Sequence, residues 1–156
     1  MSEILFYHLE QRPLEQVLPL LLEKTLEKGW KAIVETLDDS QKKALSETLW
    51  IYKDDSFLAH NIVSSAKNTL DEEQNILITT NQDNINGANV RFFVNGAIVR
   101  ASDEYERLVY MFDGHNSDAV QSARNAWKEL SQEEMSNKNI LTYWQQNNSG
   151  VWQKKA

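Results

Sequence analysis

Short apolar runs alternate with segments of helical periodicity along most of the chain, and this alternation limits the folds that it can adopt. Five runs have the length of a strand, at residues 4–9, 30–36, 75–79, 90–94 and 108–112. Strands separated by helical crossovers favour a largely parallel sheet that is covered on both faces. We therefore expect an α/β fold with an open, mostly parallel, Rossmann-like sheet and helices on both faces.

Three segments have the helical pattern. The first begins at Pro13, which suits the first position of a helix, and ends at Gly29, where a left-handed cap would terminate it. Pro19 lies inside this segment and removes one intrahelical hydrogen bond, so it predicts either a kink or a later start. The second helix is expected over residues 41–50 and the third over residues 117–134.

Polar side chains stand just before the second and third helices. Asp38, Asp39 and Ser40 precede the second helix, and Asn116 or Ser117 begins the third. Side chains of these types accept hydrogen bonds from the free N–H groups of a first helical turn. We therefore expect an N-cap at both positions.

The length of 156 residues allows one domain with a substantial core and is too small for two ordinary domains. We expect a single α/β domain over residues 1–136. Residues 137–156 form a polar carboxy-terminal extension, which carries Trp144 and Trp152 and is expected to pack on or near the domain. Residues 81–89 are rich in Asn and Gly and indicate a loop, to which no role is assigned.

Composition excludes several classes of protein. Hydrophobic residues make up 41% of the chain and charged residues 25%, which argues against a disordered chain. No apolar stretch approaches the roughly 18 residues of a membrane-spanning helix, and Glu3 stands where a leader would be basic. Together with the absence of cysteine, these features predict a reducing, cytoplasmic location and no contact with a membrane.

The net charge bears on the kind of partner. Sixteen basic residues against 23 acidic ones give a formal charge of −7, which disfavours direct binding of a nucleic-acid backbone. A small basic patch remains compatible with this balance, because basic residues gather in the last third of the chain. They include Arg124, Lys128, Lys138, Lys154 and Lys155.

The motifs of nucleotide binding and of serine hydrolases are absent. None of the five glycines falls in a G-x-G-x-x-G or G-x-x-x-x-G-K-[ST] spacing, so no phosphate-binding turn can be placed and no cofactor is expected. A G-x-S-x-G elbow is also missing. We therefore expect the fold without a nucleotide site and without catalytic residues.

Two weak candidates for metal ligands are His60 with Asp54 and Asp55, and His115 with Asp113. Such pairs could serve a metal-dependent nuclease or nucleotide hydrolase, which is the enzymatic alternative. A zinc site needs three or four converging ligands, and an isolated loop histidine is more often a solvent-exposed hydrogen bonder. We therefore expect no metal.

A cluster of basic and aromatic residues marks the last helix. Arg124, Trp127 and Lys128 have spacings of three and four, which places a guanidinium, an indole and an ammonium group on one flank. Such a flank can bind a carboxylate beside an apolar side chain. The alternative is that Trp127 belongs to the core and that the two cations are solvated.

A second aromatic group consists of Trp50, Tyr52 and Phe57, in a segment with little periodicity. Aromatic residues are common both in cores and in protein interfaces, so packing explains them as well as binding does. If they form an interface, the chain could be the scaffold of an unrelated complex.

These clusters belong to a pattern that runs along nearly the whole chain. In its order and spacing the sequence resembles the chi subunit family of the bacterial DNA polymerase III holoenzyme. The residues that carry the resemblance are Phe6-Tyr7-His8-Leu9, Leu21-Leu22-Glu23-Lys24, Gly29-Trp30-Lys31, Leu49-Trp50, Asp55-Ser56-Phe57-Leu58 with His60, Ile76-Leu77-Ile78-Thr79, Phe112-Asp113-Gly114, Ala123-Arg124 with Trp127-Lys128, and Tyr143-Trp144-Gln145-Gln146 before Gly150 and Trp152.

The resemblance implies a non-catalytic accessory subunit of the clamp-loader assembly. Members of this family bind the acidic carboxy-terminal tail of single-stranded-DNA-binding protein, which ends in aspartates followed by Ile-Pro-Phe or a close variant. Arg124, Trp127 and Lys128 fall on the positions that line the tail pocket, and Met111 or Phe112 would form its apolar floor.

The resemblance also implies a second interface, with the psi subunit or alternatively with a helicase. It includes Trp50 and Phe57. The chain departs from the family pattern nearby, because Ala59 stands where many relatives have Pro before the histidine.

Overall fold

The computed structural model describes residues 3–50, 61–62, 74–100, 102, 104–137, 140–147, 149 and 151–155. The side chains at positions 50, 61–62 and 133–137 are outside this description.

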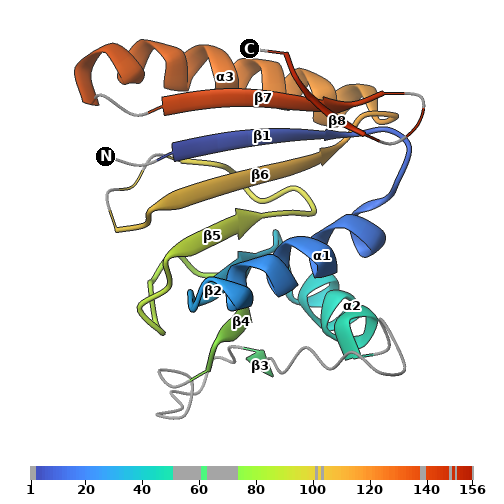
Figure 1. Ribbon diagram of the computed structural model, residues 1–156, viewed down its shortest axis with the longest axis vertical. Helices are drawn as coiled ribbons and strands as arrows, with labels where there is room; N and C mark the ends of the chain where they lie inside the picture. The colour runs from blue at the N-terminus through green and yellow to red at the C-terminus, as the bar shows by residue number, and fades with distance from the viewer. Residues whose placement is uncertain are drawn as a thin grey trace.

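Within the described residues, eight strands form one sheet in the order β3-β4-β2-β5-β6-β1-β7-β8 (Figure 1). Every neighbouring pair is parallel except β7 and β8, which are antiparallel. The expected open, mostly parallel α/β sheet is confirmed. The strands are β1 (Glu3–Leu9), β2 (Ala32–Glu35), β3 (Asn61–Ile62), β4 (Ile76–Thr79), β5 (Val90–Phe93), β6 (Arg107–Asp113), β7 (Ile140–Gln146) and β8 (Trp152–Lys154).

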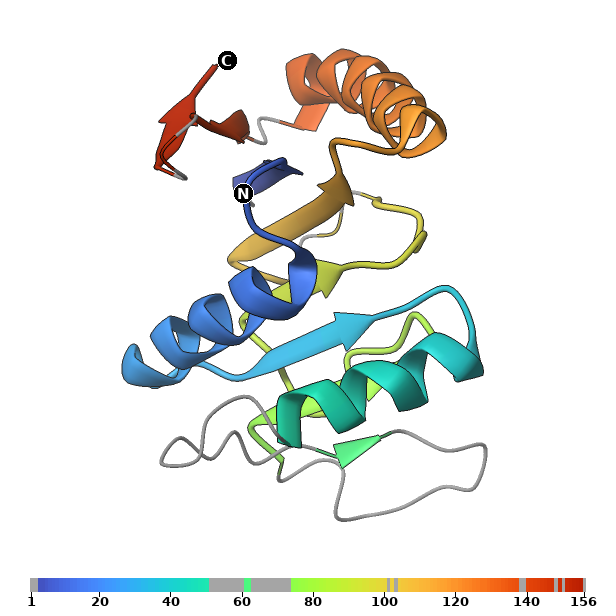
Figure 2. The ribbon, with the colours of Figure 1, turned by 90° about the vertical axis from the view of Figure 1, so that its right-hand side faces the viewer.

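Three helices are found in the described part of the chain, α1 (Leu14–Glu27), α2 (Asp39–Trp50) and α3 (Ser117–Asn137). Buried residues of α1 and α2 join one core cluster with one face of the sheet, and those of α3 join a second cluster on the other face. Figure 2 shows α1 and α3 on opposite sides of the sheet. The expected helices on both faces are therefore confirmed.

The helix ends follow the capping signals. Gly29 adopts φ +76° and donates to the Leu26 carbonyl (2.9 Å), while the N–H of Trp30 donates to the Thr25 carbonyl (3.2 Å). These two bonds form a Schellman motif, which requires a left-handed residue at the glycine position. The Asp38 carboxylate caps α2 by accepting the N–H of residue 41 at 2.9 Å.

Asn116 caps α3 in the same way, since its side-chain oxygen accepts the N–H groups of Asp118 (3.0 Å) and Ala119 (3.1 Å). The later start expected from Pro19 is wrong. Helix α1 begins at Leu14 and continues through the buried Pro19. Packing of this helix on the sheet therefore outweighs the loss of one intrahelical hydrogen bond.

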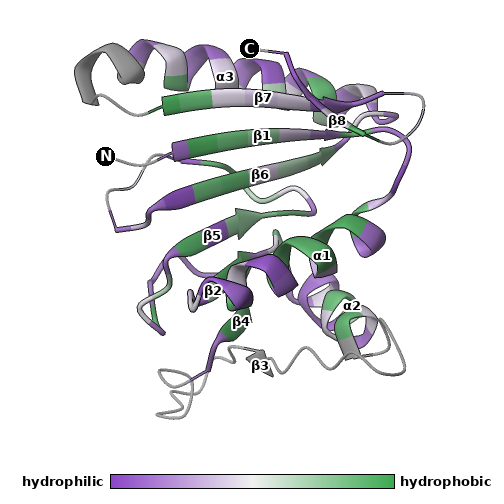
Figure 3. Cartoon of the chain, viewed as in Figure 1, coloured by the Kyte–Doolittle hydropathy of each residue, from purple (hydrophilic) through white to green (hydrophobic). Residues whose placement is uncertain are grey.

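The polar carboxy-terminal extension contains two strands of the sheet, which the sequence analysis did not predict. Strand β7 pairs in parallel with β1, so that Tyr7 lies opposite Trp144, and β8 then turns back along β7. Residues 140–144 are β-branched, aliphatic or aromatic, and they suit a strand once β1 offers a free edge. Figure 3 shows how the hydrophobic stretches of β1, β6 and β7 lie side by side.

The chain leaves the neighbouring strands β1 and β6 in opposite directions. Helix α1 follows β1 on one face of the sheet, and α3 follows β6 on the other (Figures 1 and 2). In open α/β sheets, a crevice forms at the carboxyl ends of strands where the connections diverge in this way. A crevice is therefore expected at the carboxyl ends of β1 and β6.

Candidate functional site

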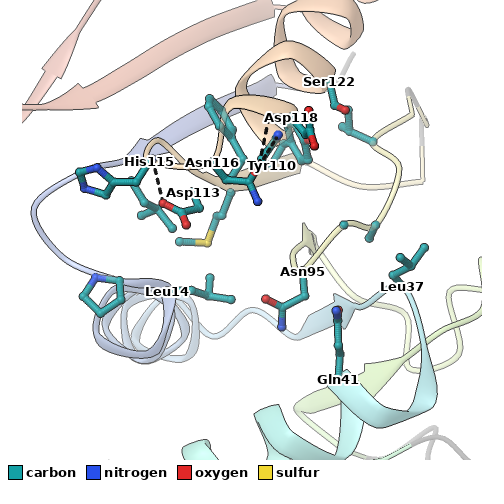
Figure 4. Close-up of a pocket in the computed structure, with 18 of the residues that line it drawn as sticks. Leu14, Leu37, Gln41, Asn95, Tyr110, Asp113, His115, Asn116, Asp118 and Ser122 are labelled. Atoms are coloured by element: carbon teal, nitrogen blue, oxygen red, sulfur yellow. Dashed lines mark hydrogen bonds between the residues drawn. The ribbon is translucent and has the colours of Figure 1, made fainter.

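An open pocket of about 810 Å³ lies at this carboxyl edge. Its walls come from the segments that follow β1, β2, β5 and β6. Figure 4 shows Asp113, Asn116 and Asp118 on one side of the pocket, and Leu14, Asn95, Gln41 and Leu37 on the other. Polar side chains therefore line both sides of the pocket.

The charged groups of this pocket are mostly acidic. It is lined by the carboxylates of Glu10, Glu15, Asp113 and Asp118 and by one guanidinium group, that of Arg12. The free N–H groups of a helix start attract anions, but neighbouring carboxylates repel a phosphate. This edge of the sheet is therefore unlike the phosphate-binding edge of a nucleotide fold.

Gly114 directly follows β6 at this edge of the sheet, and it packs closely against the end of β1. A Cβ atom built on Gly114 would lie 2.2 Å from the His8 Nε2 atom and 2.7 Å from the Leu9 carbonyl oxygen. The N–H of Gly114 donates to that same carbonyl at 2.7 Å. The glycine therefore allows the turn after β6 to approach the end of β1, and a larger residue would separate them.

His8 is a buried residue of β1 whose side chain connects β1 to β7. Its Nδ1 atom is hydrogen-bonded to the Tyr143 hydroxyl at 2.7 Å, and its Nε2 atom lies 3.2 Å from a Glu10 carboxylate oxygen. Gln145 donates to the same Glu10 oxygen at 2.7 Å. Burial lowers the pKa of His8, Glu10 opposes this effect, and the positive charge of Arg124 adds to it.

The flank of α3 that carries the predicted residues lies near His8 and Tyr143. Arg124 is exposed, and its charge acts on Tyr143 as well as on His8. Burial raises the pKa of the Tyr143 hydroxyl, and Arg124 opposes that rise. Arg124 therefore lies within electrostatic reach of the side chains that link β1 and β7.

Trp127 is half-buried, and it serves the core with one side of its indole. The ring meets Phe6 edge-on, with centroids 5.2 Å apart, and Tyr143 edge-on at 5.8 Å. Lys128, the next residue of α3, is exposed. The flank therefore has an anchored indole between two solvent-facing cations.

The two candidates for the apolar floor lie on opposite faces of the sheet. Phe112 belongs to the core on the α3 face, and its ring centroid lies 5.1 Å from that of His8 and 6.1 Å from that of Tyr143. Met111 belongs to the core on the α1 face. Both residues reach the carboxyl-edge pocket, whose lining does not include Arg124, Trp127 or Lys128.

Other predicted residues lie outside the described part of the chain. Phe57 and the metal candidates Asp54, Asp55 and His60 are among them, and Trp50 ends α2 with a side chain that is not described. Among the described residues, no three His, Cys, Asp or Glu side chains are grouped to hold a metal ion. No helix in the described part of the chain has the length and apolar character of a membrane span.

Gln146 has a role that the sequence analysis missed. Its buried side-chain oxygen accepts backbone N–H groups of Gln11 (3.0 Å) and Arg12 (3.1 Å), with a longer contact to Glu10 (3.4 Å). This oxygen holds the loop between β1 and α1. The Tyr143-Trp144-Gln145-Gln146 motif contained the signal, because three of its four side chains hydrogen-bond or pack against β1 and the following loop.

A buried charge network was also missed. Arg91 on β5 is 1% exposed, and its Nε atom donates to Glu35 at 3.0 Å. Arg100 approaches the same carboxylate with two nitrogens, at 2.8 and 3.1 Å. The carbonyls of Asn81 and Asp83 also accept from Arg91, so the loop at residues 81–89 helps to satisfy a buried guanidinium.

Comparison with known proteins adds one finding. A family model described as DNA polymerase III chi subunit, HolC, matches residues 1–138. A comparison with curated proteins found no match.

Proposed function

The chain belongs to the DNA polymerase III chi subunit family, and from this premise we propose how it acts. It is a non-catalytic accessory subunit of the clamp-loader assembly in the cytoplasm. It binds the acidic carboxy-terminal tail of single-stranded-DNA-binding protein and so links that protein to the replisome. Arg124, Trp127 and Lys128 on α3 form the binding surface.

The observation that carries this proposal is the anchored indole between two available cations. Neither Arg124 nor Lys128 forms an ion pair with a carboxylate in the described part of the chain. A guanidinium group binds a carboxylate through two parallel hydrogen bonds, and an ammonium group adds charge without strict geometry. Among the described residues nothing occupies these two cations, so they can receive the aspartates and the terminal carboxylate of the tail.

The apolar end of the tail needs a rigid surface. The edge-on contacts of Trp127 with Phe6 and Tyr143 hold the indole in one orientation and leave part of it exposed. Aromatic side chains contact one another favourably in edge-on and offset arrangements. A terminal Phe of the tail would contact this exposed part of the indole, and Phe112 on the same face is the better candidate for the floor than Met111.

The expected affinity is moderate. Burying one Phe side chain contributes about 1.5 to 3 kcal/mol, and each hydrogen bond to a charged group about as much. Ordering a flexible peptide offsets part of this gain, so a free energy of about −7 to −8 kcal/mol, near micromolar, is expected. Salt should weaken the binding, because the charges involved are exposed.

Calorimetric titration with a tail peptide tests the proposal. Arg124→Ala should weaken binding at least about tenfold, and removal of the terminal Phe from the peptide should abolish most of it. Lys128→Ala should weaken binding less, and Lys43→Ala, a change of an exposed lysine on α2, should have no effect. Equal affinity of the unchanged protein and Arg124→Ala would contradict the assigned surface.

A further inference from the structure

A second groove, of about 270 Å³, lies between α1 and the last strands of the sheet. One wall is formed by Tyr7, Trp144 and Trp152, from β1, β7 and β8. The other wall is formed by the α1 stripe that includes Leu20 and Lys24.

The topology leaves this part of the sheet without a covering helix among the described residues. Helix α1 runs from β1 toward β2, while β7 and β8 extend the sheet in the other direction. Helix α3 packs on the opposite face (Figure 2). The groove thus lies at the border between the strands that α1 covers and the aromatic surface of β7 and β8, which α1 does not cover.

The aromatic wall is rigid. The rings of Tyr7 and Trp152 meet edge-on with centroids 4.7 Å apart, and the Trp144 indole N–H donates to the Thr142 hydroxyl at 3.0 Å. All three aromatic side chains remain half-buried. Half-exposed, immobilised aromatic groups lose little entropy when a partner covers them.

The charge of the groove is opposite to that of the whole chain. Arg12 and Lys24 line it, and no carboxylate does. Neither cation forms an ion pair with a described carboxylate. The register places Lys154 opposite Trp144, which adds a third cation beside the aromatic wall. In a chain of formal charge −7, this is a local positive surface.

Two of the three aromatic residues of the first wall, Trp144 and Trp152, lie beyond the part of the chain that the family model matches. The match ends at residue 138, and β7 and β8 begin at Ile140 and Trp152. The groove is also on the opposite face of the sheet from Trp127. It is therefore a separate surface from the α3 flank.

We propose that this groove binds an acidic segment of a partner protein, in which carboxylates flank an aromatic or aliphatic side chain. The apolar side chain packs between Leu20 and the aromatic wall, and the carboxylates pair with Arg12 and Lys24. The segment needs no free carboxy terminus, since side-chain carboxylates can pair with both lining cations. This inference does not depend on the function proposed for the α3 flank.

The geometry favours a peptide over single-stranded nucleic acid. Bases bind such surfaces by stacking on open aromatic faces. In this groove the edge-on contact between Tyr7 and Trp152 directs one ring into the face of the other. Two lining cations are also few for a phosphate backbone approaching a chain of charge −7.

Fluorescence anisotropy with the full chain and a labelled peptide, acetyl-Asp-Asp-Phe-Asp-Leu-Asp-amide, tests the proposal. The unchanged protein should bind it, and Trp152→Ala and Lys24→Glu should each weaken binding about tenfold or more. Trp152→Phe, which retains an aromatic ring against Tyr7, should restore most of the affinity. Lys43→Glu, the same charge change on α2, should alter the affinity less than about twofold.

Arg124→Ala separates the two proposals, because it should remove tail binding and leave binding of the capped peptide unchanged. Absence of binding by the unchanged protein would overturn the groove proposal alone. Equal affinity of Lys24→Glu and the unchanged protein would overturn it as well. Displacement of the peptide by oligothymidylate, with loss of oligonucleotide binding in Trp152→Ala, would identify the groove as a nucleic-acid site instead.

Discussion

The two faces of the sheet each carry a tryptophan beside basic residues, but the supports of the two tryptophans differ. On the α3 face, the half-buried Trp127 packs against the core and meets Phe6 and Tyr143 edge-on. On the α1 face, Trp152 is anchored to Tyr7 at a sheet margin that no described helix covers. An indole held beside cations can thus be built on a helix flank or on a sheet edge that no described helix covers.

The supports also differ in what holds the neighbouring loop. On the α3 side, Gly114 lets the turn after β6 approach His8. On the α1 side, Gln146 holds the loop that carries Arg12. Changes at these supports should therefore affect the two surfaces unequally, and the following substitutions test that expectation.

Gly114→Ala should have the largest effect. Its Cβ atom would lie 2.2 Å from His8, and overpacking of this severity should destabilise the fold by about 3 kcal/mol or more. Denaturant unfolding measures the loss. Gly87→Ala is the control, because Gly87 has φ +67° and no atom within 4 Å of the added Cβ. It should cost only about 1 kcal/mol, and equal losses for the two variants would contradict the packing role.

Gln146→Ala should have the next largest effect. The buried acceptor of the loop N–H groups is lost, and a destabilisation of about 2 kcal/mol is expected. The capped acidic peptide should bind more weakly, because Arg12 loses its fixed position, while tail binding at Arg124 should persist. Gln145→Ala, which removes a single bond to Glu10, is the control and should destabilise less. A reversed order would show that the loop does not depend on Gln146.

Tyr143→Phe should have a smaller effect. The variant removes the hydroxyl that bonds to His8 Nδ1 at 2.7 Å, at a cost of about 1 kcal/mol. Tyr7→Phe is the matched change on the other face, where no described group is hydrogen-bonded to the hydroxyl. Thermal unfolding should show a lower Tm for Tyr143→Phe than for Tyr7→Phe. Equal Tm values would mean that the His8 bond contributes nothing.

The smallest expected effect is a pH dependence on the α3 side. Burial lowers the pKa of His8, so the unfolded chain takes up a proton before the folded chain as the pH falls below about 6.5. The free energy of unfolding should therefore decrease through this window and level off below the folded pKa. Denaturant unfolding between about pH 7.5 and about pH 5.5 should show a shallower decrease for His8→Gln. An unchanged slope in His8→Gln would contradict the assignment of this pH dependence to His8.

Local signals in the sequence predicted much of the fold. The left-handed cap at Gly29 and the N-caps at Asp38 and Asn116 are determined by side chains within a few residues of each helix end. The alternation of strand and helix segments likewise predicted the parallel sheet. These features could be found because the interactions that produce them are short-range.

Features that depend on distant partners could not be predicted. Strand β7 ends in two glutamines, and its strand character depends on the free edge of β1, more than 130 residues away in the chain. The buried Arg91 is stabilised by Glu35 and by loop carbonyls that no local pattern brings together. For the same reason the sequence could not choose between Met111 and Phe112 as the apolar floor. Strand pleating places the two residues on opposite faces, and distant partners decide which face α3 covers.

The most direct test of the account follows the indole N–H signals of the five tryptophans by NMR while the tail peptide of single-stranded-DNA-binding protein is added. The Trp127 signal should shift and saturate near micromolar peptide, while the signals of Trp144 and Trp152 should stay in place. A shift of Trp152 with a stationary Trp127 would contradict the assignment of tail binding to the α3 flank.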